Sequence, residues 1–196
     1  MNHPETRTGS RQDLSVPIGW AYLYMLLLAV PLTAALALAF VGVWGWDRFS
    51  DGLGRFLEWP SLVASLVIGV PLHEVLHGLA WAFFGQRPLK DVRFGVQWKL
   101  LTPYAHLQVP IRARAYRLGA AMPALLLGLL PYLVGLVVGD GWFTALGLLY
   151  LFAAGGDLLV LWLLRKVDGQ ALVEDHPSRA GCYAHGMSEN GGGQGV

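Results

Sequence analysis

The chain has 196 residues, of which 55% are hydrophobic and only 14% are charged; this balance excludes an ordinary soluble domain and indicates an integral membrane protein. The formal net charge of +1 excludes nucleic acid as a main partner, because there is no charge excess to neutralise phosphates. The single cysteine, Cys182, cannot form a disulfide within the chain.

Four apolar stretches are long enough to cross a bilayer, which takes about 20 residues. We predict the first span over about 18–44, which is too long for a cleavable signal peptide. The other three are predicted over about 60–85, between Arg117 and Asp140, and over 142–164. Prolines in the third span, Pro123 and Pro131, predict bends there. The expected fold is an all-α membrane protein with four transmembrane helices.

Lysine and arginine are concentrated between the second and third spans, whereas the segment between the third and fourth spans has neither. The positive-inside rule therefore places the basic segment in the cytoplasm, and alternation of the spans places both termini there as well. A bacterial inner membrane is the simplest setting. The basic residues of this segment are Arg87, Lys90, Arg93, Lys99, Arg112, Arg114 and Arg117.

The same basic segment predicts a short β-hairpin on the cytoplasmic side, between the second and third helices. Apolar and polar residues alternate over 92–100 and again over 104–111, with a break at Thr102-Pro103. An exposed strand edge can hold an extended peptide by backbone pairing, so His106 and Gln108 on the polar side are candidate substrate-binding residues. The alternative is a basic lid whose arginines contact anionic lipid headgroups.

The second span contains the run His73-Glu74-Val75-Leu76-His77. Residues four apart lie on one face of a helix, so both histidines can bind one metal ion with Glu74 beside them as a base. These are the only ionisable side chains from 59 to 86, and such groups are costly at membrane depth unless they are paired, hydrated or bound to metal. The pattern predicts a zinc site.

Asp157 is the candidate for a third protein ligand. It is the single charged residue of the fourth span, which runs in the same direction as the second, so its carboxylate is expected at a similar depth to the histidines. Three protein ligands leave a fourth position for water. Gly155 and Gly156 would allow the helices to approach closely. In the alternative reading, Asp157 pairs with an arginine such as Arg165, and the ligand is one of His106, Asp140, Asp168 and His176.

These residues resemble intramembrane zinc metalloproteases of the site-2 protease type, and more closely the small family of zincin peptidases called domain of unknown function 3267. The resemblance rests on the run from His73 to Gly78, on a proline-containing span around Met122-Pro123, and on Gly155-Gly156-Asp157. It covers about residues 60 to 165. It implies Zn²⁺ held by His73, His77 and Asp157, with Glu74 as the general base.

The predicted function is hydrolysis of peptide bonds in membrane proteins near the cytoplasmic side of the bilayer, with Glu74 activating a zinc-bound water. The expected partners are a membrane protein or peptide substrate and the lipid bilayer. The alternatives are a membrane protein that binds or transports metal without proteolysis, and an inactive scaffold that tolerates replacement of Glu74. The expected organisation is a polar segment over 1–13, a membrane metallopeptidase domain over 14–169, and a disordered glycine-rich tail over 170–196.

Overall fold

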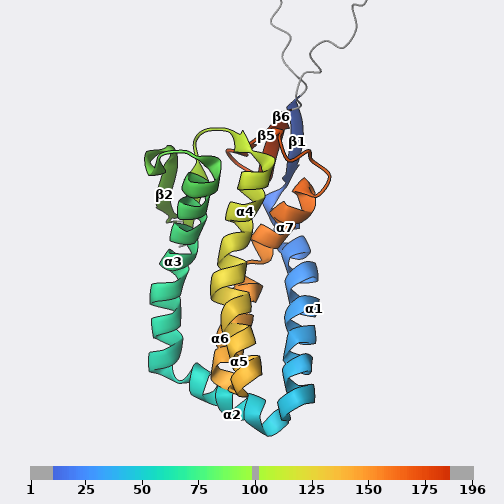
Figure 1. Ribbon diagram of the computed structural model, residues 1–196, viewed down its shortest axis with the longest axis vertical. Helices are drawn as coiled ribbons and strands as arrows, with labels where there is room; N and C mark the ends of the chain where they lie inside the picture. Colours follow the sequence, from blue (N-terminus) through green and yellow to red (C-terminus); the bar gives the residue numbers. More distant parts are fainter. Residues whose placement is uncertain (1–10, 99–101, 186–196) are drawn as a thin grey trace, which may run out of the picture.

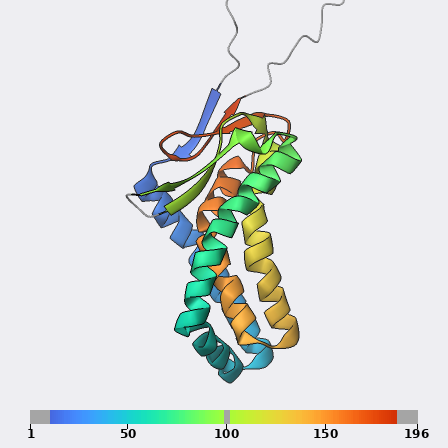
Figure 2. The same cartoon turned by 90° about the vertical axis from the view of Figure 1, so that its left-hand side faces the viewer.

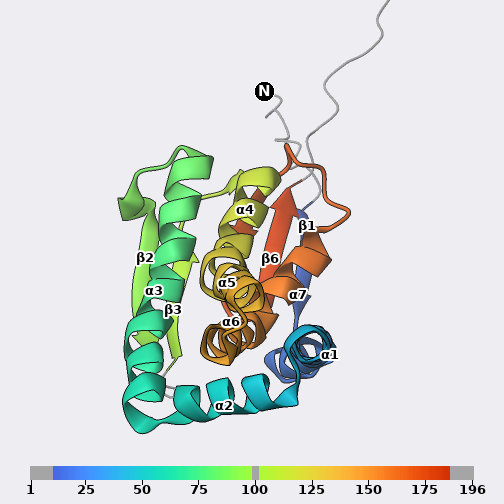
Figure 3. The same cartoon turned by 60° about the horizontal axis from the view of Figure 1, so that its bottom comes forward.

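The computed structural model describes residues 11–98 and 102–185. Long helices run beside one another, with small β-sheets at one end and α2 (Trp46–Leu57) across the other (Figure 1). Seen from the α2 end, the middle helices lie between α3 on one side and α1 on the other (Figure 3). The two ends of the described chain, Arg11 and His185, both lie in the sheets.

Within the described residues, three helical segments are long and apolar enough to cross a membrane, in agreement with the first three predicted spans. Two are unbroken helices. The third begins as a helix, passes through a π-helical segment that starts directly after Pro123, and continues as a helix. Because proline cannot donate the usual backbone hydrogen bond, the irregularity falls where the sequence predicted a bend. The segments are α1 (Ile18–Trp44), α3 (Trp59–Gly85), and α4 (Ala113–Pro123) with η2 (Ala124–Leu129) and α5 (Leu130–Val138).

The fourth predicted span is broken. α6 (Gly141–Ala153) and α7 (Gly155–Leu164) meet at an angle of 51°. Together they are long and apolar enough to form a fourth span, which would be bent at this point. Gly155 does not bring α7 toward α3 as we expected. It packs against α1, because a Cβ atom at Gly155 would lie 2.4 Å from Cγ of Met25. The three to four apolar helices are consistent with localisation in a membrane.

Large apolar side chains cover the outside of these helices. Val67 on α3 is 67% exposed, and Val137 on α5 is 77% exposed. A soluble protein rarely leaves so much contiguous apolar surface in water, whereas helices with satisfied backbone hydrogen bonds and apolar outer faces suit a hydrocarbon environment.

α2 was not among the predicted helices, since its charged residues give a low average hydrophobicity. Its apolar face nevertheless packs on the protein, where Phe49 and Phe56 are buried. α2 lies very close to α6, because a Cβ atom at Gly52 would lie 2.2 Å from the backbone of Gly141. Asp140 caps α6 by accepting from the Trp142 amide at 2.8 Å and pairs with Arg55 of α2 at 2.9 Å, so this third-ligand candidate has a structural role where α2 meets α6.

The predicted hairpin is present. After the short 3₁₀ turn η1 (Leu89–Asp91), β2 (Val92–Gln97) pairs antiparallel with β3 (Thr102–Leu107). Thr102 and Pro103 belong to β3, so the predicted break there is wrong; Lys99 and Leu100, expected in the first strand, lie outside the described residues. Gly78 lets the hairpin rest on α3, because a Cβ atom there would lie 2.2 Å from Cζ of Phe94.

A second, four-stranded antiparallel sheet joins the two ends of the described part of the chain in the order β1-β6-β5-β4. The prediction of a disordered tail from 170 is therefore wrong over 172–185, and residues 186–196 lie outside the described part. The strands are held by inward apolar residues, with Val173, Cys182 and Ala184 buried in one cluster with Leu164. The strands are β1 (Arg11–Val16), β4 (Ile111–Arg112), β5 (Leu172–Asp175) and β6 (Ala180–His185).

Cys182 offers a test of this packing. Its side chain is fully buried in β6, and burial raises the pKa of the thiol to about 12. Because the thiolate is the reactive form, we expect a water-soluble maleimide at pH 8 to modify the folded protein about 100-fold more slowly than the denatured protein. Mass spectrometry of timed samples measures both rates. Equal rates would mean that the C-terminal strands are not packed as described.

Candidate metal centre

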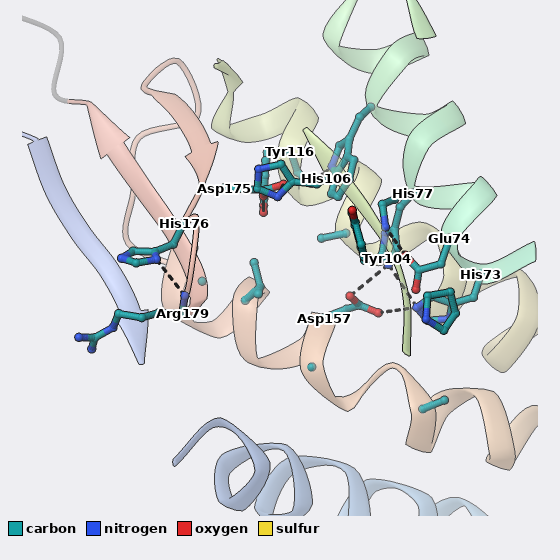
Figure 4. Close-up of a pocket in the computed structure, with 18 residues that line it drawn as sticks. His73, Glu74, His77, Tyr104, His106, Tyr116, Asp157, Asp175, His176 and Arg179 are labelled. Atoms are coloured by element: carbon teal, nitrogen blue, oxygen red, sulfur yellow. Dashed lines mark hydrogen bonds and ion pairs between the residues drawn. The ribbon is translucent and has the colours of Figure 1, made fainter. Parts of the chain in front are cut away.

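The two histidines of α3 and the aspartate of α7 converge on one point (Figure 4). Nε2 of His73 lies 3.1 Å from Oδ2 of Asp157, and Nε2 of His77 lies 3.2 Å from Oδ1 of the same carboxylate. The two Nε2 atoms are 3.2 Å apart. Arg165 instead donates to the Trp162 carbonyl, so the alternative pairing of Asp157 with Arg165 is wrong.

These separations fit a bound divalent ion. With ligand bonds of about 2.0–2.1 Å, the ligand atoms of a tetrahedral zinc site lie about 3.3 Å apart. One ligand atom from each of the three residues lies within 4.8 Å of the others, and within residues 11–98 and 102–185 this is the one such group of three or more histidine, cysteine or carboxylate residues. Two imidazole nitrogens and a carboxylate oxygen match the donor set of catalytic zinc sites.

The ring of His77 is held in the orientation that a metal ligand requires, with Nε2 facing the converging group. Its Nδ1 atom lies 2.9 Å from the carbonyl oxygen of Gly119 on α4; because a carbonyl only accepts, Nδ1 donates and Nε2 of the neutral ring keeps its lone pair. Pro123 is four residues beyond Gly119 and has no N–H with which to bond that carbonyl in the helix. The proline therefore leaves this acceptor to His77.

An aromatic side chain packs on one face of the same imidazole ring. Trp81 stacks on His77 with ring centroids 5.2 Å apart and an interplanar angle of 15°. The indole donates to the Tyr116 carbonyl at 3.1 Å. Gly119 makes room for it, because a Cβ atom there would lie 2.0 Å from Cδ1 of Trp81. Helix α4 therefore positions a ligand that is carried by α3.

Replacing Pro123 by alanine restores an N–H that competes with His77 for the Gly119 carbonyl. We expect Pro123→Ala to weaken zinc binding by about 10–100-fold, the effect typical of losing a partner that orients a ligand. Pro131→Ala, in the same span but beyond the π-helical segment, is the matched control and should bind zinc as the wild type does. Competition against a chromophoric chelator measures both affinities. Equal weakening in both variants would point to general helix distortion instead.

Glu74 lies beside the three ligand residues but is not one of the converging group. Its Oε2 atom accepts a hydrogen bond from the Ala105 amide of β3 at 2.6 Å. Within the described residues Oε1 has no such partner, so it can take a proton. Glu74 and the three ligand residues line one cavity of about 350 Å³. A carboxylate held in this way suits a general base that is close to the metal without binding it.

Of the two predicted substrate-binding residues, only His106 lines this cavity. Its Nδ1 atom lies 3.3 Å from Oδ2 of Asp175, a carboxylate that also accepts from the Leu107 amide at 2.8 Å. Burial raises the pKa of Asp175, while its hydrogen bond from Tyr116 opposes that shift. Gln108 is exposed and lies outside the lining.

The remaining third-ligand candidates do not join the histidine pair. Asp168 accepts from the Gln170 amide at 2.7 Å in a turn after α7. His176 lines the cavity but uses its Nδ1 atom to accept from the Arg179 amide at 2.9 Å. Neither residue belongs to the group of converging ligands formed by His73, His77 and Asp157.

Sequence reasoning missed the supporting residues around the ligands. The separation of Gly119 and Pro123 by one helical turn was a readable sign that a carbonyl is left free. Asp175 and Arg179 carried no such sign, because they belong to a segment whose composition suggested disorder. The structure brings both to the same cavity as the histidines.

Two imidazoles and a carboxylate around one point, with a second carboxylate beside them, define the type of site found in metal-dependent hydrolases. Comparison with known proteins agrees with this class. The profile of the family described as "Putative zincin peptidase" matches residues 66–172, which is more than half of the chain, so the protein belongs to that family. The family indicates a metallopeptidase and implies zinc. No curated protein and no solved structure gives a significant match.

Proposed function

We propose that the protein is a membrane-embedded zinc endopeptidase of the site-2 protease type, which cleaves membrane proteins near the cytoplasmic side of the bilayer. The observation that carries the proposal is the convergence of His73, His77 and Asp157 on one point, with the unligated carboxylate of Glu74 in the same cavity. The ligands come from α3 and α7, and α3 is apolar enough to span a membrane.

The depth of the site supports cleavage near one membrane face. The hairpin and the four-stranded sheet lie at one end of the helices (Figure 1), and the cavity is lined both by helix residues and by β3. Five of the 14 lysine and arginine residues lie between α3 and α4, and two more lie near the start of α4. The positive-inside rule therefore assigns this end to the cytoplasm.

When bound, a zinc ion supplies Lewis-acid chemistry, polarising the peptide carbonyl and lowering the pKa of water toward 7. His73, His77 and Asp157 would hold it. The free Oε1 atom of Glu74 takes the proton of the attacking water and returns it to the leaving amine. The Ala105 amide on Oε2 keeps the carboxylate aimed into the cavity during both transfers.

The hairpin supplies a place for an extended substrate. The amides of Ala105 and Leu107 point away from β2, since they donate to Glu74 and Asp175 rather than to the partner strand. A peptide lying along this edge of β3 is therefore beside the general base. Because these two amides are already engaged, pairing at this edge would use carbonyl oxygens of β3 as acceptors for the amides of the substrate, which gives affinity without demanding one sequence.

The test is cleavage by purified protein in nanodiscs, supplied with zinc and a complex peptide mixture. New peptide termini found by mass spectrometry should require the wild-type protein, disappear with Glu74→Gln or a zinc chelator, and return when zinc is restored. The same termini from the Glu74→Gln protein would assign the cleavage to a contaminant. No cleavage by zinc-loaded wild type would favour a metal-binding or scaffold protein.

A further inference from the structure

A second cavity, of about 670 Å³, adjoins the metal-site cavity. The two share the lining residues Tyr104, Ala105, His106, His176 and Arg179, so the space continues from the metal site along β3. Figure 4 shows His176 and Arg179 across the first cavity from His73 and Glu74. The second cavity is lined by Ile18 at the start of α1 and by residues of the hairpin, which runs beside the upper half of α3 in Figure 2.

The ionisable side chains that line the second cavity are almost all basic. Apart from Tyr104, its ionisable side chains are Arg93, His106, His176 and Arg179, and no carboxylate is among its lining residues. In the described part of the chain neither arginine forms an ion pair with a carboxylate. Arg179 makes one long contact, 3.3 Å, to the Ser15 carbonyl. Both guanidinium groups therefore have hydrogen-bond donors to spare.

Two carboxylates near this cavity already have hydrogen-bond partners of their own. Asp175 pairs with His106 and is engaged by Tyr116 and the Leu107 amide. Asp13, on β1, accepts from the Ser15 hydroxyl at 2.6 Å. That hydrogen bond lowers the pKa of Asp13, and the charges of His176 and Arg179 lower it further. The two arginines remain the strongest anion-binding groups of the cavity.

We propose that this second cavity is a subsite for a carboxylate of the peptide substrate, bound by Arg93 and Arg179. The inference rests on the proposed peptidase function. Guanidinium groups bind carboxylates through two parallel hydrogen bonds, and a substrate extended along β3 from Glu74 enters this cavity. The carboxylate belongs either to an acidic side chain or to the C-terminus of the substrate.

The experiment measures binding apart from cleavage. The probes are fluorescent twelve-residue peptides of alanine and valine with one glutamate or one glutamine moved along the chain, each as a free acid and as an amide. Glu74→Gln protein in nanodiscs of neutral lipid is titrated with each peptide. At one position we expect glutamate to bind about tenfold more tightly than glutamine, as a charge-assisted hydrogen bond gives; a preference seen only with the free acid assigns the C-terminus.

Variants made on the Glu74→Gln background identify the groups responsible. Arg93→Gln and Arg179→Gln should each reduce the preference for glutamate, the double variant should abolish it, and Arg179→Lys should keep part of it. Arg165→Gln removes the same charge from an exposed arginine that stacks on Trp162 and is the matched control. A preference that survives the double variant, or equal binding of all peptides, overturns the subsite.

Further results distinguish this subsite from lipid binding and test it separately from the peptidase function. If the preference disappears when phosphatidylglycerol is added to the nanodiscs, the arginines bind lipid phosphate and the proposal is wrong. Cleavage by wild-type protein without any charge preference overturns the subsite alone. Carboxylate-dependent binding without cleavage by zinc-loaded wild type overturns the peptidase function alone.

Discussion

Replacing Glu74 by glutamine is expected to lower the kcat/KM of peptide hydrolysis by about 10²–10⁴-fold, the usual contribution of a general base. Glutamine has the same shape and keeps an oxygen that can accept from the Ala105 amide, so β3 should stay in place. It carries no charge and cannot take the proton of water. Because Glu74 is outside the group of converging ligands, the variant should retain the zinc content of the wild type.

The distinguishing measurement is metal content and activity on the same preparation. Elemental analysis of detergent-purified protein should give about one zinc per chain for wild type and for Glu74→Gln, as expected for one three-ligand site. Loss of zinc in Glu74→Gln would make Glu74 a ligand. Full activity in this variant would remove it from the chemistry and leave the assignment as a base without support.

The second large effect is expected for Asp157→Ala, which leaves two neutral imidazoles to hold a divalent cation. Zinc affinity should fall by more than the 10–100-fold typical of losing an orienting partner, because a charged ligand is lost outright. His73→Ala should show a loss of the same order. A competition titration against a chelator of known affinity measures each constant.

Asp168→Ala is the matched control for this loss, because it removes an aspartate of the same C-terminal half that is exposed and lies outside the cluster. It should bind zinc with wild-type affinity. If Asp157→Ala keeps its zinc, the third ligand is another group and the convergence in Figure 4 does not represent the metal site.

The helices could be predicted because the sequence pattern that indicates them is local. Apolar runs of about 20 residues identify membrane-length helices directly, and α1 and α3 begin and end within a residue or two of the prediction. The pairing of His73 with His77 follows from helical periodicity alone. Alternation of polar and apolar residues likewise predicted the hairpin, although not its turn.

The elements that were missed depend on contacts with distant residues. α2 is held by Phe49 and Phe56 against other helices, a stabilisation that its charged sequence conceals. β5 and β6 are short and consist mostly of small or polar residues, yet Val173 and Cys182 are completely buried once the strands pair. Tertiary packing outweighed the composition of the segment, as it commonly does for strand propensity.

The sequence by itself determined the chemistry: two imidazoles on one helical face, a carboxylate between them, and apolar segments long enough to span a membrane. Only the tertiary structure decided which aspartate meets the histidines, because α7 and α3 are 84 positions apart at the Asp157–His73 contact. It also decided that Gly119 orients His77 and that the C-terminal strands line the cavity. Periodicity acts over a few residues, whereas convergence of ligands depends on how whole helices pack.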